Sequence, residues 1–220
     1  MSRIELQTED GLTLEGEMRL PEGAPEGSAV ICHPHPRQGG SKDHPLLWAI
    51  RGDLAGRGFA VLSFNFRGVM GSKGTYGEGV AELMDVRAAI GRAREAAPAP
   101  TLVCGWSFGA HVALREALED DRVSALVLIG LPLAESSLLL PPLPDRAKLS
   151  RLQGPVLLLV GEADPFCPLP DLRALERRLP RATVQIVKAT DHFFWKRERE
   201  AARIVGSFAQ RELLGGGPVE

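Results

Sequence analysis

Short apolar runs that lack polar alternation recur along this chain, and they limit its fold more than any other feature. Examples are "FAVLSFNF", "TLVCG", "VSALVLIG" and "PVLLLVG". A strand that is apolar on both sides is buried on both faces, as in a parallel sheet covered by helices. Between the runs, apolar residues recur at helical spacing, over residues 43–57, 78–96, 108–119, 170–179 and about 196–213. This alternation predicts an α/β fold with a doubly wound, mainly parallel sheet and helices on both faces.

The N-terminal segment follows a different pattern. "RIELQTEDGLTLEGEMRL" alternates apolar and polar residues on both sides of Asp10-Gly11, a dipeptide that favours a tight turn. The segment therefore predicts an antiparallel hairpin at the start of the sheet.

Composition argues against several classes of function. The 220 residues suffice for one domain with a full core, and the net charge of -2 provides no basic surface for nucleic acid or an anionic membrane. The three cysteines are isolated from one another, which favours reduced thiols. The N-terminus lacks an apolar signal region, and no apolar run approaches the length of a membrane span. We therefore expect a cytoplasmic protein.

One strand end carries a serine between two glycines, in Gly105-Trp106-Ser107-Phe108-Gly109. Ligands of open α/β sheets bind beyond the carboxyl ends of the strands. An apolar strand precedes this serine and a helical pattern follows it. Glycines at both sides permit a sharp turn that lifts the hydroxyl above the sheet edge, at a helix N-terminus where free N–H groups favour negative charge. The pattern predicts Ser107 as a catalytic nucleophile.

A serine nucleophile requires a base. Of the five histidines, only His192 follows the last predicted strand, in "KATDHFFW". His111 lies in the same predicted helix as Ser107, so its side chain points along that helix and does not readily reach the hydroxyl. His44 lies at a predicted helix start. We therefore predict that His192 is the base.

The base in turn requires an orienting acid, which we expect after an intermediate strand. Two carboxylates follow "PVLLLVG", namely Glu162 and Asp164. The shorter Asp164 side chain suits a tight loop ended by Pro165, and it is the predicted acid, with Glu162 as the alternative. Asp191 adjoins His192 in the chain, and the side chains of neighbouring residues diverge.

The oxyanion formed by serine attack needs two N–H donors. Phe108, the residue after the nucleophile, is the first candidate. The second is expected in the loop "CHPHPRQGG", where the prolines have no N–H, so His35 is the candidate and Arg37 the alternative. A metal site at His33 and His35 is another interpretation, but no carboxylate or cysteine with suitable spacing accompanies them.

Aromatic residues near the strand ends are candidates for the substrate pocket. They are Trp106, Tyr76, Phe193 and Phe194. The apolar, proline-rich segment 131–150 is too short for a helical cap domain, and it forms either a small lid or pocket wall or a buried connector. The glycine-rich loop "FNFRGVMGSKGTYGEG" matches neither phosphate-binding pattern, GxxxxGK[ST] or GxGxxG, which argues against a nucleotide-binding protein.

These segments resemble the α/β-hydrolase superfamily. "GWSFGA" is similar to its nucleophile elbow, and Ser107, Asp164 and His192 follow one another in the chain order typical of it. With "ICHPHPRQGG" and "FNFRGVMGSKGTYGEG", the chain resembles a group of small, lidless bacterial serine hydrolases related to dienelactone-hydrolase-like and peptidase-like enzymes. The resemblance spans about residues 4–212. It implies a single α/β-hydrolase domain over residues 1–220, without a large cap domain and with a sheet of about eight strands.

The resemblance also implies esterase-type chemistry without a cofactor or metal. Dienelactone hydrolase uses a cysteine at the position of Ser107, so its substrate is not carried over. We expect a serine hydrolase that cleaves a small carboxylic ester through an acyl-enzyme, with a small molecule as substrate and neither nucleic acid nor membrane as partner. A thioesterase or small-peptide hydrolase with the same triad, and a non-catalytic ligand-binding scaffold, are the alternatives. The oligomeric state stays open.

Overall fold

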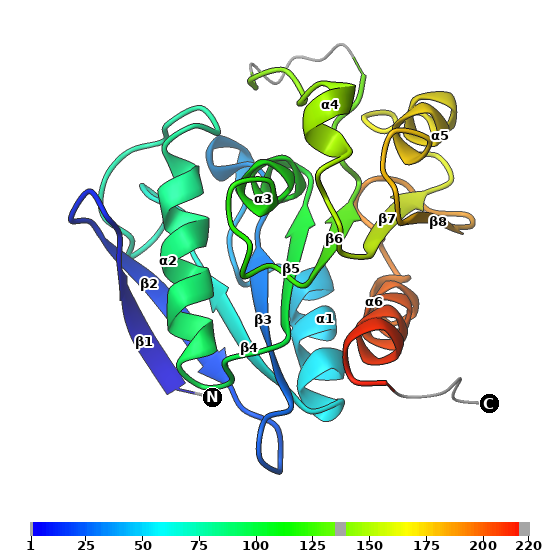
Figure 1. The fold of residues 1–220 in the computed structure, drawn as a ribbon. Helices are drawn as coiled ribbons and strands as arrows, with labels where there is room; N and C mark the ends of the chain where they lie inside the picture. Colours follow the sequence, from blue (N-terminus) through cyan, green and yellow to red (C-terminus); the bar gives the residue numbers. More distant parts are fainter. Residues whose placement is uncertain (1, 135–139, 216–220) are drawn as a thin grey trace.

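A mixed sheet of eight strands forms the centre of the computed structural model, which describes residues 2–134 and 140–215 (Figure 1). The strand order is β1-β2-β4-β3-β5-β6-β7-β8. β2 pairs antiparallel with β1 and β4, and all the other neighbours are parallel. The strands are β1 (Ser2–Gln7), β2 (Thr13–Arg19), β3 (Gly27–Cys32), β4 (Phe59–Phe64), β5 (Thr101–Trp106), β6 (Ala125–Ile129), β7 (Val156–Gly161) and β8 (Ala182–Val187). The predicted mainly parallel sheet with an antiparallel hairpin is confirmed.

The side-chain pattern of each strand agrees with its place in the sheet. Every residue of β3, β4, β5, β6 and β7 is buried, because helices cover both of their faces. β2 alternates between buried and half-buried residues. β8 alternates between exposed and half-buried residues over most of its length, as expected for a strand at the sheet edge.

Helices pack on both faces of the sheet, as predicted (Figure 1). α1 (Pro45–Gly56) and α6 (Glu198–Leu213) share one apolar core with one face. α2 (Glu82–Arg94), α3 (Phe108–Ala117) and α5 (Leu169–Glu176) contribute to the core on the other face. Two short elements, the 3-10 turn η1 (Pro36–Gln38) and α4 (Arg146–Leu149), are additional to the predicted helices.

The parallel strands bring the loops that follow them to one edge of the sheet. These loops follow β3, β4, β5, β6, β7 and β8, and they contain every residue predicted to be catalytic. Part of the predicted lid or connector, residues 135–139, lies outside the described residues. Its first described residues are fixed, because the amides of Leu133 and Ala134 donate to the carbonyl of Phe166 at 2.8 and 3.1 Å. No helix in the described ranges has the length and apolar character of a membrane span.

Candidate active site

Ser107 lies at the sharp turn between β5 and α3. Its backbone has φ 55° and ψ -116°, a conformation that L residues rarely adopt and that costs on the order of 1–3 kcal/mol. The Ser107 amide donates to the carbonyl of Ile129 in β6 at 2.8 Å, which anchors the turn to the neighbouring strand. The strained turn therefore holds a serine hydroxyl at the carboxyl end of the sheet, where the sequence predicted a nucleophile.

The two glycines flanking Ser107 are explained by close backbone approaches. A Cβ atom at Gly105 would overlap the carbonyl oxygen of Gly109, one turn ahead. A Cβ atom at Gly109 would overlap the carbonyl oxygen of Cys32, at the end of β3. Any larger residue would push α3 away from the sheet and change the turn that presents Ser107.

His192 and Asp164 form a buried hydrogen-bonded pair. His192 Nδ1 lies 2.7 Å from Asp164 Oδ2, and the two residues are 5% and 6% exposed. The other carboxylate oxygen, Oδ1, accepts the amide of Phe166 at 2.9 Å. The indole of Trp106 donates to the carbonyl of His192 at 3.2 Å. Because the Asp164 carboxylate accepts a hydrogen bond from Nδ1–H, Nε2 of the neutral His192 ring carries the lone pair that can take a proton from a hydroxyl.

Glu162, the alternative acid, has a different partner. Its carboxylate is exposed and accepts the amide of Ala189 at 3.0 Å, so it braces the loop after β8. The structure thus brings Asp164, and not Glu162, to the imidazole of His192.

Gly130, at the end of β6, lies directly against this pair. Its φ is +52°, and a Cβ atom there would lie 2.9 Å from His192 Nδ1 and 3.0 Å from Asp164 Oδ2. Gly130 was not predicted from the sequence as a site residue. The available signal was a glycine immediately after an apolar strand, in "VSALVLIG", at the edge where the site was expected.

Ser107 and His192 line one pocket of about 110 Å³, together with the loop after β3, His44, Trp106, Phe166 and Phe193. The Ser107 hydroxyl makes no hydrogen bond to any residue that the structure describes. In ligand-free enzymes such bonds are often long and shorten when substrate binds. The pocket therefore contains the predicted nucleophile and the predicted base, with room for a small reacting group.

The two predicted oxyanion donors follow neighbouring strands: Phe108 comes directly after Ser107, and His35 lies in the loop after β3. The amides of Phe108 and His35 donate no hydrogen bond within the described chain, and His35 lines the pocket. Phe108 is the first residue of α3, where helix N–H groups lack an internal partner. The amide of His35, which lines the pocket, and the amide of Phe108, next to Ser107 in the chain, are therefore both available to donate to an anionic oxygen.

The neighbouring imidazoles, His33 and His35, bind protein groups. Phe66 N–H donates to His33 Nε2 at 3.0 Å, so His33 Nδ1 is the donor to the carbonyl of Pro34 at 2.6 Å. Burial lowers the pKa of His33 to about 4, which keeps the ring neutral. Among the described residues, no group of three or more His, Cys, Asp or Glu side chains is placed to hold a metal ion.

Of the four aromatic residues predicted to line the pocket, two do so and two do not. Trp106 and Phe193 line the pocket. Phe194 is fully buried in the core between α1, α6 and the sheet, so it packs rather than faces the pocket. Tyr76 is not among the lining residues. Its hydroxyl lies 3.2 Å from Nε2 of His35, which does line the pocket.

Outside the loop after β3, two further lining residues were not predicted. His44 is the N-cap of α1, where its Nδ1 accepts the amide of Leu46 at 3.2 Å and its ring lies 4.4 Å from that of Trp106. Phe166 places its ring 4.8 Å from the His192 ring in an edge-on contact. The His-Pro dipeptide at the start of α1 signalled the cap, but no local pattern placed either side chain in the pocket.

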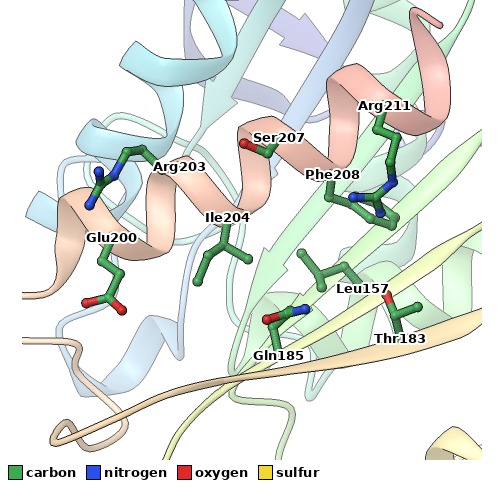
Figure 2. Close-up of a pocket in the computed structure, with 9 residues that line it drawn as sticks. All are labelled: Leu157, Thr183, Gln185, Glu200, Arg203, Ile204, Ser207, Phe208 and Arg211. Carbon is green, nitrogen blue, oxygen red and sulfur yellow. The ribbon is translucent and has the colours of Figure 1, made fainter. Parts of the chain in front are cut away.

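A second hollow, of about 400 Å³, lies between α6 and the edge strand β8 (Figure 2). Gln185 and Thr183 of β8 face α6 across it, and Ser207 lies on the helix side. The described residues that line it include no histidine. It is larger than the pocket at Ser107, but its described lining does not combine a serine with a histidine, so the smaller pocket is the candidate active site.

A strained serine turn beside a buried His–Asp pair, on an eight-stranded mainly parallel sheet, defines an α/β hydrolase-type protein. Comparison with known families agrees, because residues 29–210 match the α/β-hydrolase domain family. The chain therefore belongs to that family, as the sequence resemblance indicated.

Solved structures with the same fold include serine hydrolases and esterases. A lidless α/β serine hydrolase from Xanthomonas campestris is 26% identical, with a TM-score of 0.81 over 99% of this chain and 96% of that chain. An α/β serine hydrolase homologue from Coxiella burnetii is 24% identical, with a TM-score of 0.81 over 93% and 95% of the two chains. An esterase from Pyrococcus furiosus has a TM-score of 0.81 over 96% and 92% of the two chains at 19% identity, a likeness of fold.

Proposed function

We propose that this protein hydrolyses small carboxylic esters, with Ser107 as nucleophile, His192 as general base and Asp164 as the orienting acid. The observation that carries the proposal is the 2.7 Å bond between His192 Nδ1 and Asp164 Oδ2, in the pocket that Ser107 also lines. The similarity of the fold to that of an esterase supports ester chemistry.

In the acylation step, His192 Nε2 takes the Ser107 hydroxyl proton as Oγ bonds to the ester carbonyl carbon. The carbonyl π electrons move to oxygen, and the amides of Phe108 and His35 donate to this oxyanion. When the oxyanion collapses, the bond to the alcohol oxygen breaks. His192 then gives its proton to that oxygen, which leaves as the alcohol.

In the deacylation step, water takes the place of the alcohol. His192 removes a proton from the water as its oxygen bonds to the acyl carbon, and the second oxyanion uses the same two donors. Its collapse breaks the bond to Ser107 Oγ, which recovers its proton from His192. The carboxylic acid leaves and the enzyme is restored.

The size of the pocket favours a short acyl group. Its volume of about 110 Å³ is small beside the roughly 300–1,000 Å³ of sites that enclose drug-sized ligands. Trp106, Phe166 and Phe193 bound the space with rigid rings. A long acyl chain would have to extend outside the pocket.

A p-nitrophenyl ester series from acetate to decanoate, hydrolysed by wild type and Ser107→Ala side by side, tests the proposal. We expect the highest kcat/KM at acetate or butyrate and a loss of several orders of magnitude in Ser107→Ala. Matched thioester and dipeptide substrates are assayed in parallel. Equal rates for wild type and Ser107→Ala would contradict the proposal, and turnover of thioesters or peptides alone would replace the ester by one of those substrates.

A further inference from the structure

Tyr76 contacts the two residues whose amides are the proposed oxyanion donors. Its hydroxyl lies 3.2 Å from His35 Nε2, and its ring lies 5.1 Å from the His35 ring and 5.7 Å from the Phe108 ring. The His35 and Phe108 rings are themselves 5.3 Å apart, edge to face. Tyr76 is therefore placed to act on the site through its neighbours rather than by touching the contents of the pocket.

The direction of the Tyr76–His35 hydrogen bond follows from the other nitrogen of the ring. The backbone amide of Arg37 donates to His35 Nδ1 at 3.1 Å, so Nδ1 carries a lone pair. The proton of the neutral imidazole is therefore on Nε2, which donates to the Tyr76 oxygen. Burial, and to a smaller extent Arg37, lower the pKa of His35 and favour this neutral form.

The loop that carries Tyr76 is itself held in place. The carboxylate of Glu82, in α2, accepts the amide of Gly77 at 2.7 Å and that of Gly79 at 2.9 Å. Glu82 is fully buried, so these bonds are shielded from water. The Tyr76 hydroxyl is thus held in place beside the His35 ring.

Every polar group of His35 except its backbone amide forms a hydrogen bond within the described chain. The His35 carbonyl accepts the amides of Gln38 and Gly40 at 3.0 and 3.1 Å. Its ring is held by Arg37 on one side and Tyr76 on the other. These bonds hold the Cα atom and side chain of His35, and the Pro34 carbonyl, which shares a peptide with the His35 N–H, accepts from His33 Nδ1 at 2.6 Å.

We propose that Tyr76 is a positioning residue: through the His35 ring, its hydroxyl holds the His35 N–H where the oxyanion forms. This inference rests on the proposed ester hydrolysis and on His35 as an oxyanion donor. Oxyanion donors act chiefly in the transition state, so loss of the hydroxyl lowers kcat and leaves KM nearly unchanged. Full removal of one donor costs about 10²–10³ in kcat, and a loosened donor costs less, about tenfold.

The test compares Tyr76→Phe, His35→Ala and the double variant with wild type. Tyr76→Phe keeps the ring contacts and removes only the hydroxyl, whereas His35→Ala keeps the backbone N–H and removes only the ring. Each protein is assayed for kcat and KM with p-nitrophenyl acetate and for Ki of a trifluoromethyl ketone, which forms a tetrahedral adduct with a reactive serine. Thr75→Ala is the control, because Thr75 precedes Tyr76 in the same loop and its exposed side chain makes no hydrogen bond to any described residue. Melting temperatures identify variants that lose activity by unfolding.

We expect Tyr76→Phe to lower kcat about tenfold and to raise Ki by a similar factor, with KM within about twofold of wild type. The double variant should be no worse than His35→Ala, because the two side chains act through one hydrogen bond. Thr75→Ala should match wild type. If turnover of the acetate is too slow to measure, the rate of Ser107 labelling by a fluorophosphonate replaces kcat.

Three results would overturn the inference while leaving ester hydrolysis standing. They are an active wild type with unchanged kcat and Ki in Tyr76→Phe, a change in KM alone, and losses in the two single variants that multiply in the double variant. A wild type that neither turns over the ester nor reacts with the fluorophosphonate would overturn the proposed function and this inference together.

Discussion

Gly130→Ala adds one methyl group directly beneath the His192–Asp164 pair. The new Cβ atom would lie 2.9 Å from His192 Nδ1, 3.0 Å from its Cε1 and 3.0 Å from Asp164 Oδ2. Ordinary contacts are about 3.5–4.0 Å, so the pair must move by roughly 0.5–1 Å. A displacement of about 1 Å in a catalytic group can cost about 10²-fold in rate. We therefore expect kcat/KM for p-nitrophenyl acetate to fall about 10²-fold.

The backbone of Gly130 adds a separate cost in stability. Its φ of +52° is unfavourable for alanine by about 1–2 kcal/mol. Gly11 is the matched control, because its φ is +81° and no atom lies within 4 Å of a Cβ built there. Gly11→Ala should lose similar backbone stability and keep its activity. Thermal unfolding and steady-state kinetics are measured on both variants. If kcat/KM of Gly130→Ala stays within threefold of Gly11→Ala, the contact does not control the pair and the reasoning is refuted.

The remaining predictions separate neighbouring residues of similar type. Asp164→Asn should lower kcat about 10³–10⁴-fold, whereas Glu162→Gln should stay within about twofold; steady-state kinetics with equal losses would contradict the choice of acid. Burial lowers the pKa of His111 from 6.5 to about 4, so the unfolded chain binds a proton that the folded chain excludes between those pH values. As pH falls from about 6.5 to 4, the free energy of unfolding of wild type should therefore decrease by about 1.4 kcal/mol per pH unit more than that of His111→Leu. Urea denaturation at a series of pH values measures this, and the same pH dependence in both proteins would refute it. Gly109→Ala should lower the melting temperature, whereas Gly91→Ala, a helical site with room, should raise it slightly; the reverse order would contradict the packing argument.

The mainly parallel sheet was predictable because the central strands are apolar on both faces. β3, β4, β5, β6 and β7 lack polar alternation, so their sequences alone indicate a covered parallel sheet. The short α4 and the 3-10 turn η1 were not predicted. Each spans about one turn, too short for an apolar period to be recognised.

Some residues of the site could be predicted from local sequence patterns, and others could not. Ser107 lies in a local pattern, and the positions of His192 and Asp164 after successive strands made both of them candidates. Gly130 and Tyr76 depend on partners far away in the chain: Tyr76 and His35 are 41 residues apart. Contacts of this kind leave no local periodicity, so only the folded structure shows them.

The central claim is that Ser107 is the nucleophile, and covalent labelling by a fluorophosphonate tests it most directly. Mass spectrometry of the intact protein and of its peptides identifies the modified residue. We predict one adduct per chain, on Ser107, with labelling slowed by orders of magnitude in His192→Ala and absent in Ser107→Ala. An unlabelled wild type, or an adduct that persists in Ser107→Ala, would contradict the account.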